Sequence, residues 1–119
     1  MYGFPADFTG QVFVGRMLQY VAVFSNQLMF DFDGGCAVTL QSSYSHREAK
    51  AEAGVRILEA PHLEPKLMRI LDEKVVLVSI DRNGTFQLTF ENGDRLAFYD
   101  PDERYEAYHL SWKGGGLIV

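Results

Sequence analysis

The stretch Phe86-Gln-Leu-Thr-Phe-Glu-Asn-Gly-Asp-Arg-Leu-Ala-Phe98 decides the fold, because each of its features is typical of a β-hairpin. Apolar and polar residues alternate, as in strands with one face toward a core. Asn92-Gly93 tolerates the positive φ of a tight turn, and Asn83-Gly84 marks a second such turn upstream. The sequence therefore predicts a β-meander whose inward residues are Phe86, Leu88, Phe90, Leu96 and Phe98.

An earlier part of the chain repeats this pattern. Leu28 to Leu40 can be laid over Phe86 to Phe98 with a constant shift of 58 (98 less 40), and upstream the shift falls to 57 (75 less 18). The matched residues are Leu28, Phe30, Phe32, Gly35, Val38 and Leu40 against Phe86, Leu88, Phe90, Gly93, Leu96 and Phe98. We expect a single domain over residues 1–119, with an internal pseudo-repeat at about 16–41 and 73–98.

The segments around the repeats give weaker signals. Residues 64–73 predict a short helix, with Pro65 in its first turn and Leu67, Ile70 and Leu71 on one face. Residues 45–60 suit a helix in one half and a strand in the other. Residues 105–112 predict a strand, and the terminal apolar strand 117–119 must pair within the sheet or with another subunit, which favours a homodimer.

Together these elements predict an α+β fold. It has a mainly antiparallel sheet, built from two repeated β-meander halves that can curl into a barrel-like shape, with one short central helix. A duplicated sheet of this kind often has a cleft at its pseudo-axis, which is a place where a small ligand binds.

Composition narrows the class of protein. With 119 residues, 47% of them hydrophobic and 23% charged, the chain has ordinary globular usage. The net charge of -5 and the pI of about 5.1 argue against nucleic acid as a partner. We expect a cytoplasmic protein that does not bind membranes, because the sequence shows neither a secretory signal nor a long apolar span. The single cysteine, Cys36, is expected to be a core residue.

The last third of the chain carries a resemblance. Two β-meanders, the block Phe90-Glu-Asn-Gly-Asp-Arg-Leu96 and the run from Asp102 to Leu110 precede a terminal Leu-Ile-Val. This order resembles a group of small bacterial proteins of unknown function. The resemblance implies an accessory protein without an established activity, and some similar small domains are immunity proteins that bind a toxin. It implies no catalytic residue.

Four aromatic residues near the C-terminus are the candidate contact surface: Tyr99, Tyr105, Tyr108 and Trp112. Tyrosine and tryptophan offer large contact areas with a polar tip and are enriched at binding hot spots. The leading hypothesis is a non-enzymatic cytoplasmic protein that binds another protein, such as a toxin in an immunity-type pair. A homodimer that uses the same surface is the alternative partner arrangement.

A second hypothesis uses acidic residues. Asp100, Asp102 and Glu103, together with His109, are candidates for a metal or small-ligand site, because carboxylate oxygens bind Ca²⁺ and Mg²⁺. An ordinary turn at Asp100-Pro101 explains the same residues. The sequence has no zinc-ligand spacing, nucleophile elbow, phosphate loop or dinucleotide fingerprint. No cofactor is therefore expected, and an enzyme is the less favoured reading.

Overall fold

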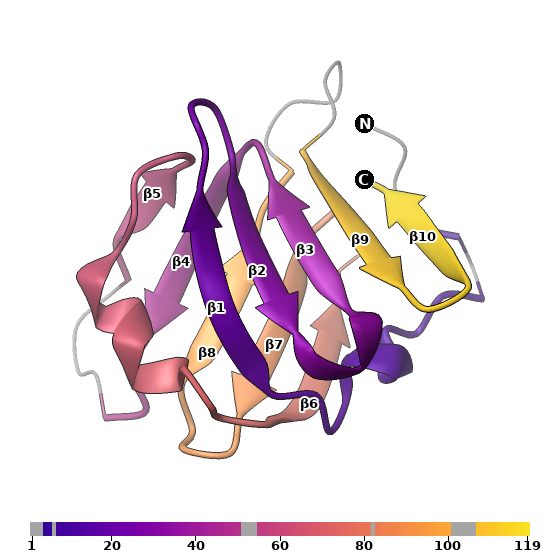
Figure 1. The fold of residues 1–119 in the computed structure, drawn as a ribbon, viewed down its shortest axis with the longest axis horizontal. Coiled ribbons are helices and arrows are strands. Elements are labelled where there is room, and N and C mark those ends of the chain that lie inside the picture. The colour runs from indigo at the N-terminus through magenta and orange to yellow at the C-terminus, as the bar shows by residue number, and fades with distance from the viewer. Residues whose placement is uncertain (1–3, 6, 51–54, 82, 101–106) are drawn as a thin grey trace.

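Two five-stranded antiparallel sheets face each other in the computed structural model (Figure 1). The structure describes residues 4–5, 7–50, 55–81, 83–100 and 107–119. The first sheet has the order β1-β2-β3-β9-β10, and the second has the order β5-β4-β8-β7-β6. Their bounds are β1 Leu18–Val23, β2 Leu28–Phe32, β3 Ala37–Leu40, β4 Ser43–Arg47, β5 Ile57–Glu59, β6 Val75–Ile80, β7 Phe86–Phe90, β8 Arg95–Phe98, β9 Tyr108–Trp112 and β10 Gly115–Ile118.

The predicted α+β class is corrected to a two-sheet, sandwich-like β fold. The sheets remain separate layers, so they do not form a barrel-like sheet. In the described parts of the chain the helical turns are all 3₁₀: η1 Gln11–Phe13, η2 Asp33–Gly35 and η3 Pro65–Ile70. The separation into two sheets follows from the fourth strand of each half. After β3, the chain crosses to place β4 on β8, and after β8 it crosses to place β9 on β3.

The two predicted meanders, β1-β2-β3 and β6-β7-β8, are present. Both second strands alternate buried and half-buried residues, and both turns at Gly84 and Gly93 have the positive φ that was expected. The two meanders also share an irregularity of pairing. In each first strand the register shifts directly after the first paired residue, which is Leu18 in β1 and Val75 in β6. A common origin by duplication stays a prediction.

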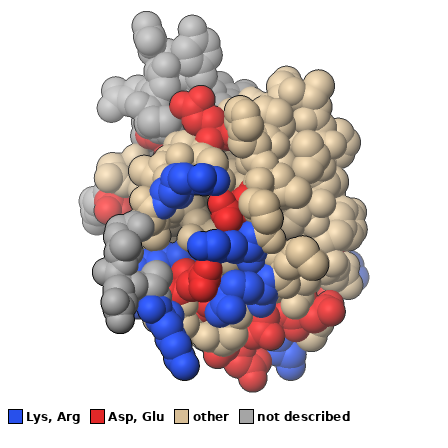
Figure 2. Space-filling view, turned by 90° about the vertical axis from the view of Figure 1, so that its left-hand side faces the viewer, with Lys and Arg blue, Asp and Glu red and all other residues tan. Residues whose placement is uncertain are grey.

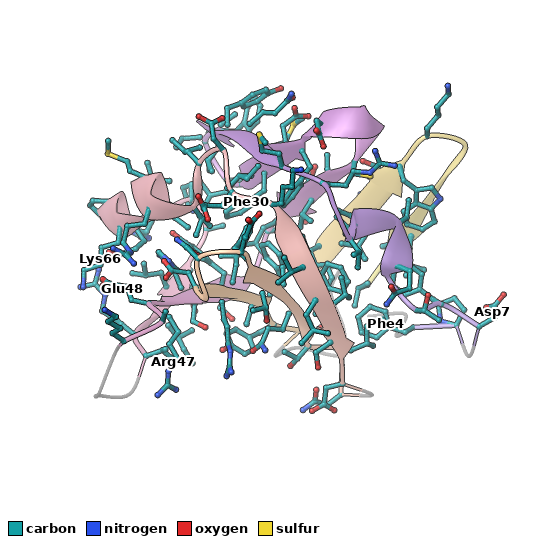
Figure 3. All side chains as sticks on the ribbon, turned by 90° about the horizontal axis from the view of Figure 1, so that it is seen from below. Phe4, Asp7, Phe30, Arg47, Glu48 and Lys66 are labelled. Carbon is teal, nitrogen blue, oxygen red and sulfur yellow. The ribbon has the colours of Figure 1, made fainter. Side chains whose placement is uncertain are left out.

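Aromatic side chains fill the space between the sheets. Phe98 of the second sheet lies with its ring centroid 5.1 Å from that of Phe30 of the first, and 6.0 Å from that of Tyr108. Figure 3 shows Phe30 between the two layers. All three rings are fully buried. Cys36 is also fully buried, as expected for a core cysteine, and burial raises the pKa of its thiol.

The central segment differs from the predicted helix in its period. The side chain of Glu64 accepts a hydrogen bond from the Lys66 amide at the start of η3. A 3₁₀-helix has three residues per turn, so residues three apart share a face. Leu67 and Ile70 are therefore buried together, while Leu71, expected on the same face, is 36% exposed beside Met68. The helix thus leaves a second apolar stripe in solvent.

The ambiguous stretch 45–60 contains β5 and most of β4, while residues 51–54 lie outside the described chain. The C-terminal strand pairs within the protein. β10 pairs with β9, and the Ala107 amide donates a hydrogen bond of 2.7 Å to the Val119 carbonyl. Because β10 pairs with β9 on one side only and is an outermost strand of its sheet, the homodimer stays a prediction.

Candidate functional site

Tyr108 is a core residue, which corrects its predicted place on a contact surface. Its side chain is fully buried, and its hydroxyl donates a hydrogen bond of 2.6 Å to the carbonyl of Gly84. Burial, together with the nearby Asp100 carboxylate, raises the pKa of Tyr108 well above its ordinary value. The alternation along β9 turns Tyr108 and Leu110 inward, so the ring of Tyr108 faces the other sheet.

The other predicted aromatic residues do not form one exposed surface. Trp112 is half-buried beneath the N-terminal segment, where its ring stacks on that of Phe8 with centroids 5.7 Å apart. Phe8 in turn stacks on Phe4. Tyr99 is half-buried on the second sheet, and its hydroxyl lies 2.7 Å from the hydroxyl of Ser45. Tyr105 lies outside the described residues. The chain itself therefore covers much of this aromatic group.

The stacking gives Trp112 a structural role that can be measured. Trp112→Ala is expected to lower the free energy of unfolding by about 2 kcal/mol, because it removes a half-buried indole and its stacking on Phe8. Urea denaturation measures the change, with Phe24→Ala at an exposed hairpin position as the control. Unchanged stability for Trp112→Ala would contradict this role.

The acidic candidates do not converge in the described structure. Asp100 is buried close to Gly84, and His109 lies on the outer face of the first sheet, opposite Thr39 of β3. Asp102 and Glu103 lie outside the described residues. In the part of the chain that the structure describes, no three His, Cys, Asp or Glu side chains are placed to hold a metal ion together.

A fully buried carboxylate, Asp94, is the centre of the densest polar network. It follows the Asn92-Gly93 turn between β7 and β8 and accepts four hydrogen bonds. His46 of β4 lies 2.8 Å away through Nε2, and the Ala49 amide donates at 3.0 Å. Arg69 of η3 donates from both Nε and Nη2, at 3.1 and 3.2 Å. We call these four residues the Asp94 network.

The network keeps Asp94 ionised in spite of its burial. Burial alone would raise the pKa of this carboxyl, but the hydrogen bonds from Arg69, His46 and Ala49 outweigh it and hold the pKa below its usual range. An ionised carboxylate only accepts hydrogen bonds, so Nε2 of His46 carries its hydrogen. Nδ1 of the same ring is buried, and no described residue makes a hydrogen bond with it.

An apolar groove lies between β1 and η3, and we call it the η3 groove. Its volume is about 440 Å³. Its exposed apolar side chains are Tyr20 at 48%, Leu63 at 46%, Met68 at 76% and Leu71 at 36%. The remaining lining residues are Gln19, Val21, Glu64, Pro65 and Leu67. The groove therefore combines the free stripe of η3 with the outermost strand of the first sheet.

Neither the Asp94 network nor the η3 groove was predicted. His46 and Asp94 are 48 residues apart, so only the pairing of β4 with β8 brings them together. The one local signal is the asparagine turn, since Asn92 accepts a hydrogen bond from the Asp94 amide and thereby fixes the loop. The groove was missed because an α-helical period of about 3.6 residues predicts Leu71 in the core, whereas the 3₁₀ period leaves Leu71 exposed.

Fold and surface together define a small two-sheet β protein with an apolar groove at one sheet edge and a buried ionic network beside it. The model of a protein family described as "Family of unknown function (DUF6188)" matches residues 9–119. The match covers nearly the whole chain, so the protein belongs to this family. No curated protein and no solved structure gives a significant match.

The family match confirms the resemblance to proteins of unknown function, whereas the immunity role stays a prediction. None of the helical segments in the described chain is long and apolar enough to cross a membrane.

Proposed function

We propose that this protein is a non-enzymatic binding module for another protein, and that the partner's contact segment lies in the η3 groove. The observation that carries the proposal is the exposed apolar stripe of η3. Met68 and Leu71 remain in solvent although Leu67 and Ile70 of the same segment are buried. Exposed apolar side chains gathered along a groove, rather than scattered singly, are typical of protein-interaction sites.

The strand beside the groove offers a second means of binding. β1 is an outermost strand of its sheet, and the Phe24 amide donates to the Gln27 carbonyl at the hairpin end. In an antiparallel pair of strands, residue pairs that are hydrogen-bonded through the backbone alternate with pairs that are not. Counting from Phe24, the backbone groups of Ala22 and Tyr20 therefore make hydrogen bonds with β2. The amide and carbonyl groups of Val21 and Val23 therefore point to the open edge, where another extended chain can pair with them.

These features favour an extended, apolar segment as the ligand. Such a segment would add a strand next to β1 and place alternate side chains against Tyr20, Met68 and Leu71. Polar groups among the groove's lining residues are limited to Gln19, Glu64 and the hydroxyl of Tyr20, so apolar burial supplies most of the binding free energy. A toxin in an immunity-type pair is one protein that fits this role, and a second copy of the same chain is the competing occupant.

The proposal is tested with Met68→Asp. Met68 is 76% exposed, so the substitution is expected to leave the fold intact and to weaken partner binding at least about tenfold. Partner capture from the native host followed by native mass spectrometry supplies the partner's mass. The dissociation constant is then measured for the wild type and the variant.

Leu77→Asp is the matched control, because Leu77 is 59% exposed on β6, in the other sheet. The proposal holds where Met68→Asp loses binding and Leu77→Asp retains it. Equal binding by all three proteins would contradict it. A dimer of the wild type that Met68→Asp converts to a monomer would identify the second copy as the occupant.

A further inference from the structure

Cations gather at one end of an otherwise acidic protein. Of the 11 lysines and arginines, Arg82 and Arg104 lie outside the described residues, which leaves nine. Five of these nine lie at the ends of β4 and β8 or on the segment from residue 56 through η3: Arg47, Arg56, Lys66, Arg69 and Arg95. Figure 2 shows basic side chains gathered on this face, with acidic ones among them.

Two adjoining hollows lie among these cations. The first, of about 280 Å³, is lined by His46, Arg47, Glu48, Val55, Arg56, Glu64 and Lys66. The second, of about 330 Å³, is lined by Arg47, Glu48, Ala49, Gly93 and Arg95. Arg47 and Glu48 line both, so the two hollows adjoin at these side chains, and together we call them the depression. In Figure 3, Arg47, Glu48 and Lys66 lie together at this edge of the molecule.

The depression has an excess of positive charge. Three carboxylates line the depression or form ion pairs with the five cations. Glu48 lies 3.3 Å from Lys66, and Glu64 lies 3.2 Å from Arg56. Asp94 forms an ion pair with Arg69. Five cations less three carboxylates leave a net charge of +2, in a chain whose total is -5. A dianion would neutralise this local excess.

The two arginines of the second hollow are placed against each other. Arg47 of β4 and Arg95 of β8 are direct partners in the strand register. Like charges directly opposite in a sheet are destabilising, and neither guanidinium makes an ion pair with another described residue. An anion between them removes the repulsion, and a guanidinium can bind a phosphate through two parallel hydrogen bonds.

His46, which lines the first hollow, has a buried nitrogen without a hydrogen-bond partner among the described residues. The His46 side chain is fully buried, and this nitrogen is its Nδ1. Nε2 carries a hydrogen and donates it in the hydrogen bond to Asp94. Nδ1 is therefore an acceptor when the ring is neutral and a donor when it is protonated. A phosphate group can pair with Nδ1 in both states once the ring or its cover shifts to expose this nitrogen, since phosphate offers an O–H when singly protonated and bare oxygens otherwise.

We infer that the paired hollows form a binding site for a small ligand that carries two phosphate groups. One phosphate lies in each hollow, and Arg47 contacts both. Arg56 and Lys66 contact the first phosphate, and Arg95 contacts the second. The cations Lys66 and Arg69 lie on a different face of η3 from Met68, while Glu64 lines both the first hollow and the η3 groove.

Pyrophosphate is the probe, with binding measured by calorimetry and by the rise in melting temperature at constant ionic strength. The wild type is expected to bind with a dissociation constant of about 1 mM or lower, and Arg47→Gln about tenfold more weakly. Arg47→Gln removes the repulsion with Arg95, so its melting temperature without ligand should not fall. Lys113→Gln, at an exposed turn position, is the matched control and should bind as the wild type does.

Three results would overturn the inference. The first is the absence of any binding heat or thermal shift at millimolar pyrophosphate. The second is an equal response to citrate, and the third is an equal loss in Arg47→Gln and Lys113→Gln, since either would mean a general charge effect without a phosphate site. The ¹⁵N shift of His46 Nδ1 supplies a separate readout and should move only when pyrophosphate is bound.

Discussion

Phe98→Ala is expected to lower the free energy of unfolding by about 4 kcal/mol, the largest effect of any substitution considered for this protein. Phe98 is fully buried, and its ring contacts Phe30 of the opposite sheet and Phe86 of its own, with centroids 5.1 and 6.3 Å apart. Alanine leaves a cavity that rigid sheets on both sides cannot close, so the lost burial and the cavity both count. Urea denaturation with a fluorescence or circular dichroism readout measures the change.

Phe98→Leu is the conservative companion to this variant. It keeps much of the side-chain volume and should cost about 1–2 kcal/mol. A loss below about 1 kcal/mol for Phe98→Ala would contradict the packing of the two sheets through this ring.

Asp94→Asn is expected to cost about 3 kcal/mol, the second-largest effect. The amide keeps the shape of the side chain but places a hydrogen-bond donor where Asp94 now accepts only. At least one of the donors from His46, Ala49 and Arg69 then meets another donor in a buried place. Glu91→Gln is the matched control, because Glu91 is an exposed carboxylate on the same hairpin. Near-equal stability of the two variants would show that the network does not stabilise the fold.

The same carboxylate predicts a pH dependence. The pKa of Asp94 is lowered in the folded protein from its ordinary value of 3.8. Its contribution is therefore fully present above about pH 4 and is lost as the pH falls through the lowered folded pKa. The stability difference between wild type and Asp94→Asn, measured by urea denaturation, should be constant near neutrality and shrink in strong acid. A difference that stays the same at pH 2–3 would contradict this linkage.

The meanders were predictable because their signals are local. Period-two alternation assigns Phe86, Leu88 and Phe90 to one face, and Asn-Gly pairs mark the turns, so no long-range information is needed. The division into two sheets was not predictable in the same way. It depends on the crossing of β4 and β9 to the opposite meander, and no residue type at the β3–β4 connection distinguishes that crossing from a continued single sheet.

The candidate sites escaped prediction for related reasons. Alternation along β9 separates two faces but does not say which is inward, so it is compatible with a surface position for Tyr108, which is fully buried. The N-terminal segment covers Trp112 through a contact between residues more than 100 positions apart. The η3 groove depends on a change from a 3.6-residue to a 3-residue period over six residues, which composition alone does not indicate.

The central claim, that a partner's extended segment pairs with β1 at the η3 groove, is tested most directly by amide hydrogen exchange. Exchange at Val21 and Val23 is compared for the free protein and for its complex with the captured partner. The claim predicts that both amides, which point away from β2, exchange much more slowly in the complex. The protection against exchange should extend to η3, which carries Met68. Protection confined to β9 and β10, with Val21 and Val23 unchanged, would contradict it.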